Sequence, residues 1–223
     1  MNSVGDFYEL MNLWKSLFSS FPLTAVFVNV ERHWDMRIYI VKNIDDLDDS
    51  LITTCACFFP EWRKQQMMAY KFHRGRIQNA VAYLLLVKAL KDEGVFDELP
   101  EFFYNEDKKP FLKNYTGWFF NVSHCKSAVC CVLSNNPVGI DIEEIREYKD
   151  SLANYVCNEA ELQQLSVSET KADDFYKLWT QKEAVFKLIG TGITHEIKNI
   201  LNTDNAIVTS EKIDNMWLTV ATL

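Results

Sequence analysis

Long apolar runs and a targeting signal are both missing from the sequence. Its 223 residues contain no stretch of about twenty apolar residues, the length that a membrane-spanning helix requires. The N-terminus also lacks the basic segment followed by an apolar segment that is typical of a signal peptide. We therefore expect no membrane partner and a cytoplasmic location.

Positive charge is scarce as well. The chain has 23 Lys and Arg residues against 31 Asp and Glu residues, and its net charge is −8. Because a protein that binds nucleic acid over a broad area needs a basic face, we expect no nucleic-acid partner. Residues 61–76 are different, since they include one acid and five basic residues. This basic cluster is either an ordinary helix face or a local anion pocket, and it comprises Arg63, Lys64, Lys71, Arg74 and Arg76.

Cysteine pairs with metal-ligand spacing are also absent. The six cysteines include no Cys-x-x-Cys pair and do not match the spacing of a structural zinc site. Cys130 and Cys131 lie in an apolar, strand-like run, where a free cysteine behaves as a small hydrophobic residue. We expect reduced, buried thiols.

Hydrophobic periodicity predicts a mixture of strands and helices. Apolar or alternating runs predict strands at residues 23–30, 36–41, 118–122, 128–133, 138–143, 206–210 and 217–221. Helices are predicted at residues 76–91, where the chain is apolar nearly all round, at 158–165 after the N-cap Asn158, and from 173 or 174 to 189, where Gly190 ends the helix. The expected inward stripe of the last helix is Phe175, Leu178, Val185, Phe186 and Ile189.

Two features suggest how these elements are connected. The turn residues Asn135-Asn136-Pro137 predict that the strands at 128–133 and 138–143 form a hairpin. Each half of the chain offers strands and a long helix, and Gly117 falls between a loop segment and a new strand. We therefore place a domain boundary there, giving an N-terminal half of residues 1–117 and a C-terminal half of residues 118–223.

The strand at 138–143 has two acidic residues on one side. Its apolar residues point inward, so Asp141 and Glu143 point outward together. At about 3.3 Å per residue their carboxylates start roughly 6.6 Å apart, close enough to share a cation. A site of two or three carboxylates suits Mg²⁺. The alternative is an exposed acidic strand that serves solubility.

The last predicted helix can complete such a site. Four-residue spacing places Trp179, Glu183 and Lys187 along one side of it. If the helix meets the strand, three carboxylates and one ammonium converge. A Glu–Lys pair at this spacing is equally common on an ordinary exposed helix. His124, at the end of a nearby strand, is either a structural histidine or a further member of the site.

Together these segments resemble a known family. Phe120-Asn121-Val122-Ser123-His124, Val138-Gly139-Ile140-Asp141-Ile142-Glu143 and Trp179-x-x-Lys182-Glu183-x-x-x-Lys187 resemble the three ordered motifs of 4′-phosphopantetheinyl transferases. Lys109-Pro110 resembles the Lys-Pro step that precedes them. The similarity covers residues 60–192. It has two departures, because Lys108 stands where the family often has Gly and Gln78 where it usually has Arg.

The resemblance implies the double-length, surfactin-synthetase-activating type rather than the short, trimeric type. The implied fold is α+β: a pseudo-dimer of two related halves, each a small antiparallel sheet packed with a long helix. The active site is then expected in the cleft between the halves. A chain of this type is expected to be a monomer.

The implied reaction is transfer of the phosphopantetheine arm of coenzyme A to a serine of an apo acyl or peptidyl carrier protein, which releases adenosine 3′,5′-bisphosphate. By analogy Mg²⁺ is held by Asp141, Glu143 and Glu183, and Glu183 takes the serine proton. Catalysis is also expected from Lys187, which assists the leaving group, and from His124. The coenzyme A contacts implied are Ser123, His124 and Lys187 at the phosphates, Lys109 at the adenosine, and Arg63, Arg74 and Arg76 at the 3′-phosphate.

Two other functions remain open from the sequence. One is an inactive module of the same fold that binds coenzyme A. The other is a different metal-dependent phosphotransferase or phosphodiesterase, for which Asp141 and Glu143 would serve but the Ser-His and Lys-Pro motifs would have no purpose. For a carrier protein, docking is expected between residues 145 and 173.

Overall fold

The structure is a computed structural model, and it describes residues 36–191, 195–202 and 205–223. The strand predicted at residues 23–30 lies outside the described residues. No helix within the described ranges has the length and apolar character needed to cross a membrane.

The described chain combines strands and helices, as the periodicity predicts. The strands are β1 (Met36–Lys42), β2 (Phe102–Tyr104), β3 (Pro110–Leu112), β4 (Phe119–His124), β5 (Ala128–Ser134), β6 (Val138–Glu144), β7 (Ile207–Ile213) and β8 (Met216–Thr222). The α-helices are α2 (Asp49–Phe58), α3 (Glu61–Met68), α4 (His73–Asp92), α5 (Asp150–Val156), α6 (Glu159–Val167) and α7 (Lys171–Ile189). Two short 3₁₀ segments are η1 (Ile44–Asp46) and η2 (His195–Asn202).

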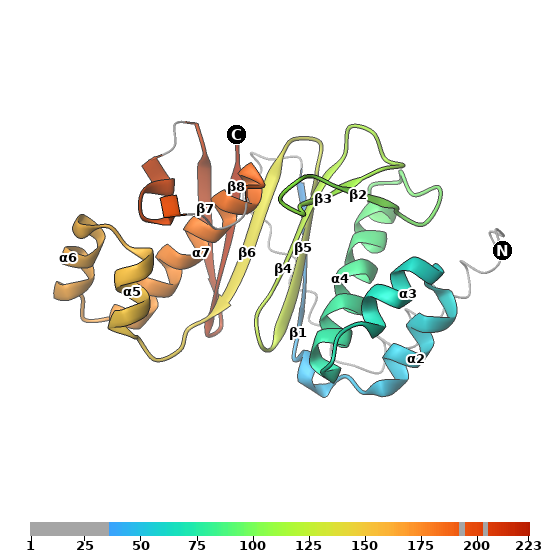
Figure 1. Ribbon diagram of the computed structural model, residues 1–223, viewed down its shortest axis with the longest axis horizontal. Helices are drawn as coiled ribbons and strands as arrows, with labels where there is room; N and C mark the ends of the chain where they lie inside the picture. The colour runs from blue at the N-terminus through green and yellow to red at the C-terminus, as the bar shows by residue number, and fades with distance from the viewer. Residues whose placement is uncertain (1–35, 192–194, 203–204) are drawn as a thin grey trace.

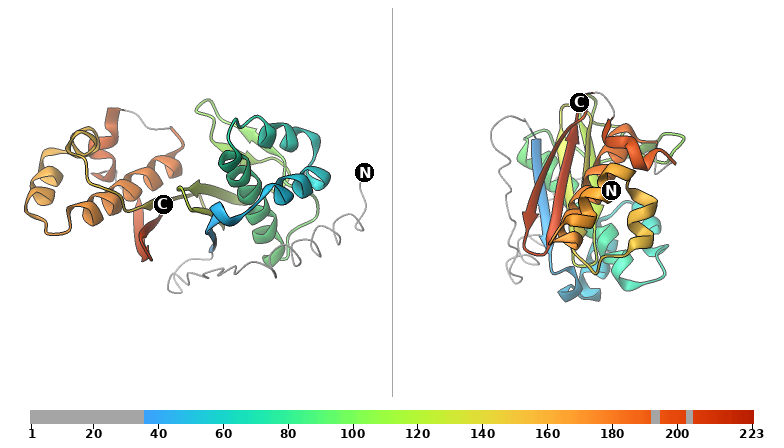
Figure 2. Two further views of the ribbon diagram at one scale, coloured as in Figure 1. Left: turned by 90° about the horizontal axis from the view of Figure 1, so that it is seen from below. Right: turned by 90° about the vertical axis from the view of Figure 1, so that its left-hand side faces the viewer.

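Two three-stranded antiparallel sheets organise the fold, and they share one strand order. The first has the order β1-β5-β4 and the second β6-β8-β7, so in both the first strand pairs with the third. The long helix α4 precedes the last two strands of the first sheet, and α7 does so in the second. Helices α2–α4 lie on one side of the strands and α5–α7 on the other (Figures 1 and 2). The expected α+β architecture with small antiparallel sheets is confirmed.

The predicted hairpin of β5 and β6 is wrong. Both edges of β5 are occupied, by β1 and by β4, and β6 pairs with β8 instead. Pro137 directly precedes β6 and has no N–H group to donate to a neighbouring strand. The turn therefore carries the chain from one sheet to the other.

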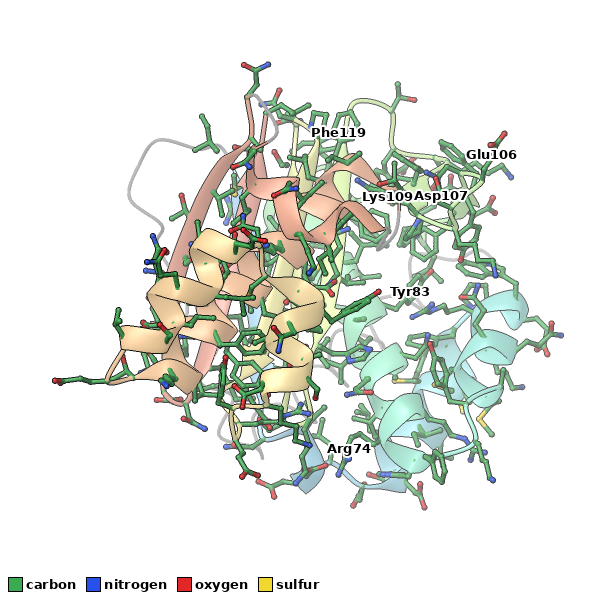
Figure 3. The ribbon with its side chains drawn as sticks, turned by 60° about the vertical axis from the view of Figure 1, so that its left-hand side comes forward. Arg74, Tyr83, Glu106, Asp107, Lys109 and Phe119 are labelled. Atoms are coloured by element: carbon green, nitrogen blue, oxygen red, sulfur yellow. The ribbon has the colours of Figure 1, made fainter. Side chains whose placement is uncertain are left out.

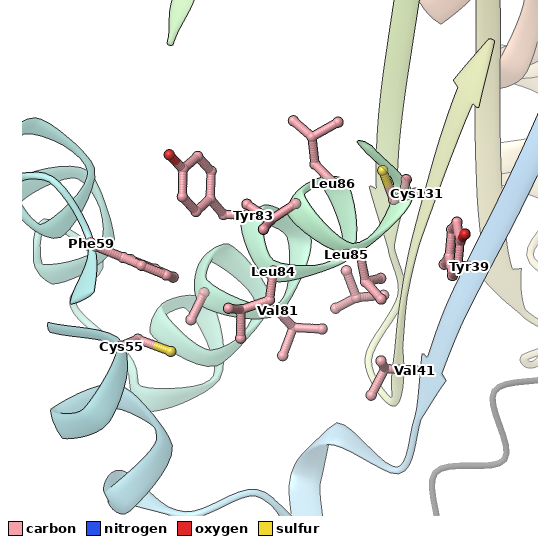
Figure 4. Close-up of a cluster of buried hydrophobic side chains, with 14 of the residues drawn as sticks. Tyr39, Val41, Cys55, Phe59, Val81, Tyr83, Leu84, Leu85, Leu86 and Cys131 are labelled. Atoms are coloured by element: carbon pink, nitrogen blue, oxygen red, sulfur yellow. The ribbon is translucent and has the colours of Figure 1, made fainter. Parts of the chain in front are cut away.

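The first core packs α4 against the sheet β1-β5-β4. Helix α4 is buried on almost every side, and its Val81, Leu84 and Leu85 pack among side chains of β1, β5 and α2 (Figure 4). Leu112 and Phe120 belong to this same core, although they lie on opposite sides of residue 117 in the sequence. The domain boundary near residue 117 stays a prediction.

The second core lies between the two sheets. It combines Ile38, Ile40, Cys130 and Val132 of the first sheet with the inward residues of the second, which are Val138, Ile140, Ile142, Leu218 and Val220. All six cysteines are free thiols, and five are buried; Cys57 is exposed, against expectation.

A third core surrounds α7. Phe175, Val185 and Phe186 are buried there, as predicted, but Ile189 is 43% exposed and was wrongly assigned to the stripe. The helix ends at Gly190, whose φ of 82° is left-handed, as the sequence indicates. Asn158 caps α6 through a capping box with Glu161.

Gly139 allows α7 to lie directly on β6. A Cβ atom at this position would come within 2.1 Å of the Ala184 carbonyl oxygen and 2.4 Å of the Leu188 backbone nitrogen. Both neighbours are helix backbone, which cannot move aside as a flexible side chain can. The absence of a side chain at Gly139 therefore sets the distance between strand and helix.

We predict that Gly139→Ala lowers the free energy of unfolding by roughly 3 kcal/mol or more, because overpacking against a backbone cannot relax. Gly94→Ala is the control, since a Cβ at Gly94 meets nothing within 4 Å and adds only the strain of its φ of 72°. The control should cost about 1–2 kcal/mol. Urea unfolding of both variants measures the difference, and equal losses would contradict the close approach.

Candidate active site

One cavity of about 420 Å³ opens between the two groups of elements. It is lined by residues of α3, α4 and β2–β4 on one side and of β6 and α7 on the other. Seven residues predicted for the site line it together: Arg63, Ser123, His124, Asp141, Glu143, Glu183 and Lys187. Residues from four separate stretches of the sequence thus meet at one cavity.

Strand and helix geometry brings the charged residues together. Gly139, Asp141 and Glu143 alternate with the inward residues of β6, so they share the face that α7 covers. Asp141 and Glu143 therefore border the cavity instead of pointing to open solvent, and Asp141 is only 4% exposed. On α7, Glu183 and Lys187 are one turn apart, and both line the cavity.

Asp141 is held by two partners. Its Oδ1 accepts hydrogen bonds from Lys187 Nζ at 2.6 Å and from Ser123 Oγ at 2.7 Å. Lys187 Nζ also donates to Ser123 Oγ at 2.7 Å. β4 lies beside β6 without strand pairing, and Asn121 Oδ1 there accepts a hydrogen bond from the Ile140 backbone N–H at 3.1 Å. Three elements therefore fix one carboxylate oxygen.

Burial and mutual repulsion shift the ionisation of the site. Burial, and then the negative charge of Asp141, raise the pKa of Glu143 and of Glu183 to about 7. Burial tends to lower the pKa of Lys187, but the Asp141 carboxylate outweighs it and raises this pKa above its ordinary value. Burial and the nearby Lys187 charge lower the pKa of His124, which favours its neutral imidazole.

The carboxylate end of the cavity fits a divalent cation. Asp141 Oδ2 is buried and has no hydrogen-bond partner, so one oxygen of this carboxylate is left unsatisfied. Glu143 and Glu183 add oxygen donors of the type that Mg²⁺ prefers. In the part of the chain that the structure describes, no three His, Cys, Asp or Glu side chains already surround one point as metal ligands. Asp141, Glu143 and Glu183 stay the predicted ligands.

Arg63 borders the other end of the cavity. Its guanidinium is buried over the Tyr83 ring at 4.8 Å, donates to the Asn79 carbonyl oxygen at 2.5 Å and to Gln66 Oε1 at 2.9 Å. Its Nε is buried without a partner, as is Asn79 Oδ1. A buried donor and a buried acceptor are therefore left unsatisfied beside the cavity.

Three predicted ligand residues do not line the cavity. Arg74 forms an ion pair with Asp45 at 2.9 Å, Arg76 Nε donates to the Tyr70 carbonyl oxygen at 2.9 Å, and Lys109 Nζ donates to the Leu188 carbonyl oxygen at 2.8 Å. Figure 3 shows Lys109 beside Glu106 and Asp107. Arg74 lies away from them, in the first turn of α4. Their contacts with a nucleotide stay predictions.

Several cavity residues were not foreseen. An aromatic wall faces the charged end, and in sequence its members look like ordinary core aromatics: Tyr83, Phe102, Tyr104 and Phe120. Gln78, which replaces the usual arginine, lines the cavity and donates to the Cys125 carbonyl oxygen at 2.8 Å. Lys182, within the last motif, is fully buried away from the cavity.

Comparison with known proteins identifies the family. A family model described as the 4′-phosphopantetheinyl transferase superfamily matches residues 137–217, which include Asp141, Glu143, Glu183 and Lys187. The 4′-phosphopantetheinyl transferase AcpT of Salmonella typhi is 34% identical over 131 residues, which cover 56% of this chain and 68% of that protein. The chain belongs to the 4′-phosphopantetheinyl transferase superfamily. The resemblance drawn from its motifs is confirmed.

Other members of the superfamily match over shorter stretches. The 4′-phosphopantetheinyl transferase gsp of Aneurinibacillus migulanus is 36% identical over 113 residues, or 50% of this chain and 45% of that protein. The 4′-phosphopantetheinyl transferase Sfp of Bacillus subtilis is 31% identical over 88 residues, or 39% of each chain. The matched region thus spans less than half the length of these two relatives.

The raised pKa values predict a pH dependence of folding without divalent ions. Glu143 and Glu183 bind protons more tightly in the folded than in the unfolded state, so their contribution to stability is complete below about pH 4.5 and is lost as the pH rises through about 7. The free energy of unfolding, measured in urea with a chelator, should therefore fall between pH 5 and pH 8.

The double variant Glu143→Gln/Glu183→Gln should flatten this slope. Glu147→Gln is the matched control, because Glu147 is exposed and lies outside the cavity lining, and it should keep the wild-type slope. A double variant with the slope of the wild type would contradict the assignment.

Proposed function

We propose that this protein transfers the 4′-phosphopantetheine arm of coenzyme A to a serine of an apo acyl or peptidyl carrier protein. One observation carries the proposal: Asp141, Glu143, Glu183 and Lys187 border one cavity in a member of this superfamily. The relatives AcpT, gsp and Sfp are named as 4′-phosphopantetheinyl transferases.

The two ends of the cavity suit the two kinds of group in coenzyme A. The charged end, with Lys187 and His124, suits the pyrophosphate. The aromatic wall suits a less charged part of the ligand that carries amides or a base. Ser123 belongs to the charged end, where its hydroxyl bonds both Asp141 and Lys187.

In the proposed reaction, the carrier serine oxygen attacks the β-phosphorus of the coenzyme A pyrophosphate. The new bond joins this oxygen to phosphorus, and the bond from phosphorus to the bridging oxygen breaks. Adenosine 3′,5′-bisphosphate leaves with the bridging oxygen. Glu183 accepts the serine proton, since its pKa of about 7 suits a general base near neutral pH. Lys187 stabilises the charge that develops on the departing phosphate.

A Mg²⁺ ion held by Asp141, Glu143 and Glu183 would neutralise negative charge on the pyrophosphate when bound. Two features of the site favour binding of a cation. Lys187 and Ser123 fix the Oδ1 atom of Asp141 and leave Oδ2 free. The raised pKa of Glu143 and Glu183 reflects burial and then repulsion by Asp141, and a cation would relieve this repulsion.

We further propose that the two halves form a pseudo-dimer with the active site in the cleft between them, and that the chain acts as a monomer. The shared strand order of the two sheets, each with its long helix, supports this relation. Six free thiols fit the reducing cytoplasm proposed as its location.

The proposal is tested by incubating the protein with coenzyme A, Mg²⁺ and a panel of apo carrier proteins. Mass spectrometry should show a gain of one phosphopantetheine arm on at least one carrier. We predict that Glu183→Gln lowers turnover about 100-fold or more, because it removes the general base, while coenzyme A still binds.

Glu211→Gln serves as the control and should retain wild-type turnover, because Glu211 is exposed, lies outside the cavity lining and lies outside the predicted docking segment. Coenzyme A binding without transfer to any carrier would overturn the transferase assignment in favour of an inactive binding module. Transfer at the wild-type rate by Glu183→Gln would show that another group takes the proton.

A further inference from the structure

The turn between β2 and β3 reaches across to the end of α7. Lys109 Nζ donates to the Leu188 carbonyl oxygen at 2.8 Å, and Asn105 Nδ2 donates to the Gly190 carbonyl oxygen at 2.9 Å. The last carbonyls of an α-helix have no partner within the helix. Two side chains from 79 and 85 residues away in the sequence therefore complete the C-terminus of α7.

The turn itself is rigidly built. Asn105 Oδ1 accepts from the Lys109 backbone N–H at 2.7 Å, and the Asn105 N–H donates to the Lys109 carbonyl oxygen at 3.1 Å. Lys108 adopts a left-handed φ of 64°, which lets the chain reverse between the two residues. Asn105 and Lys109 are thus fixed to each other before they bind α7.

The absence of a side chain at Gly190 leaves room for the Lys109 side chain. A Cβ at Gly190 would come within 2.6 Å of Lys109 Cδ, so the hydrocarbon stem of the lysine lies against the glycine. The ammonium is also 5.5 Å from the centre of the Phe111 ring, and burial lowers its pKa. A positive charge at the C-terminus of a helix is favourable, because it opposes the negative end of the helix dipole.

The same hairpin forms part of the cavity wall. Phe102 and Tyr104 of β2 and Pro110 of β3 line the cavity. Phe102 stacks on Phe120 at 5.1 Å, which ties the hairpin to the first core. The clamped carbonyl belongs to Leu188, the residue that follows Lys187 directly. The turn thus connects the aromatic wall to the helix that carries Lys187 and Glu183.

We propose that Lys109 and Asn105 are positioning residues, which hold the C-terminal turn of α7 so that Lys187 and Glu183 keep their place at the cavity. In this proposal the Lys109 ammonium acts through α7 and not on the nucleotide. This differs from the adenosine contact that the sequence motif suggests. The turnover measurement below rests on the proposed transferase function, whereas the hydrogen-exchange measurement does not.

The test uses Lys109→Met, which keeps the hydrocarbon stem over Gly190 and removes the donor. We expect turnover to fall about 10- to 100-fold, because a small displacement of catalytic groups is costly. The KM for coenzyme A should stay within about twofold, because binding contacts are retained. Hydrogen exchange of the backbone amides at residues 186–190 should become faster, while exchange in α4 stays unchanged.

Lys108→Met is the matched control. It removes the same charge from the same turn, but Lys108 is exposed, and it should leave turnover and exchange unchanged. Lys109→Arg should restore most of the turnover, because it can still donate to the Leu188 carbonyl. Asn105→Ala should speed exchange at the same amides, which gives a second measurement if Lys109→Met folds poorly.

A raised KM for coenzyme A with unchanged turnover and unchanged exchange in Lys109→Met would overturn the proposal and show that Lys109 contacts the nucleotide. If the wild type transfers nothing to any carrier, the proposed function fails. The hydrogen-exchange data still test whether Lys109 and Asn105 hold the C-terminal turn of α7. Faster exchange confined to Lys109→Met and Asn105→Ala supports it. Equal exchange in Lys109→Met and Lys108→Met refutes it.

Discussion

The site depends on one backbone contact, between α7 and β6 at Gly139. Any side chain at this position would collide with the helix backbone at Ala184 and Leu188. Because the contact is that close, the side chains that flank it on the same face of the strand meet those of the helix. The glycine of the strand motif is thus the reason that Asp141 can reach Lys187, although the two are 46 residues apart in the sequence.

Charge compensation is the second constraint. Asp141 is almost completely buried, and an unpaired carboxylate there would be costly. Lys187 satisfies one of its oxygens and leaves the other without a partner, while burial and then the Asp141 charge raise the pKa of Glu143 and of Glu183. Shifted pKa values in a partly compensated cluster of this kind are common at functional sites.

Local patterns in the sequence predict the elements well and their pairing poorly. Alternation revealed β6, and four-residue spacing revealed the face of α7, because both depend on the period of one element. The partner of β6 is β8, almost 80 positions later, and no local pattern encodes that choice. For the same reason the motif could not reveal that the Lys109 ammonium bonds the Leu188 carbonyl oxygen, 79 residues away in the sequence. The aromatic wall was not predicted, because the sequence does not distinguish an aromatic residue that lines a cavity from one that lies in the core.

Lys182 and Lys187 lie on the same helix with opposite surroundings. Lys182 is 0% exposed, and its ammonium bonds the Val156 and Lys198 carbonyl oxygens and the Glu161 carboxylate. Five residues turn an α-helix by about 500°, so Lys187 points roughly 140° away from Lys182, toward the cavity. The three acceptors around Lys182 therefore fix the rotational phase of α7. Insertion of a single residue between the two lysines would rotate one of them by about 100° relative to the other. Lys182 could then not reach its three acceptors while Lys187 points into the cavity.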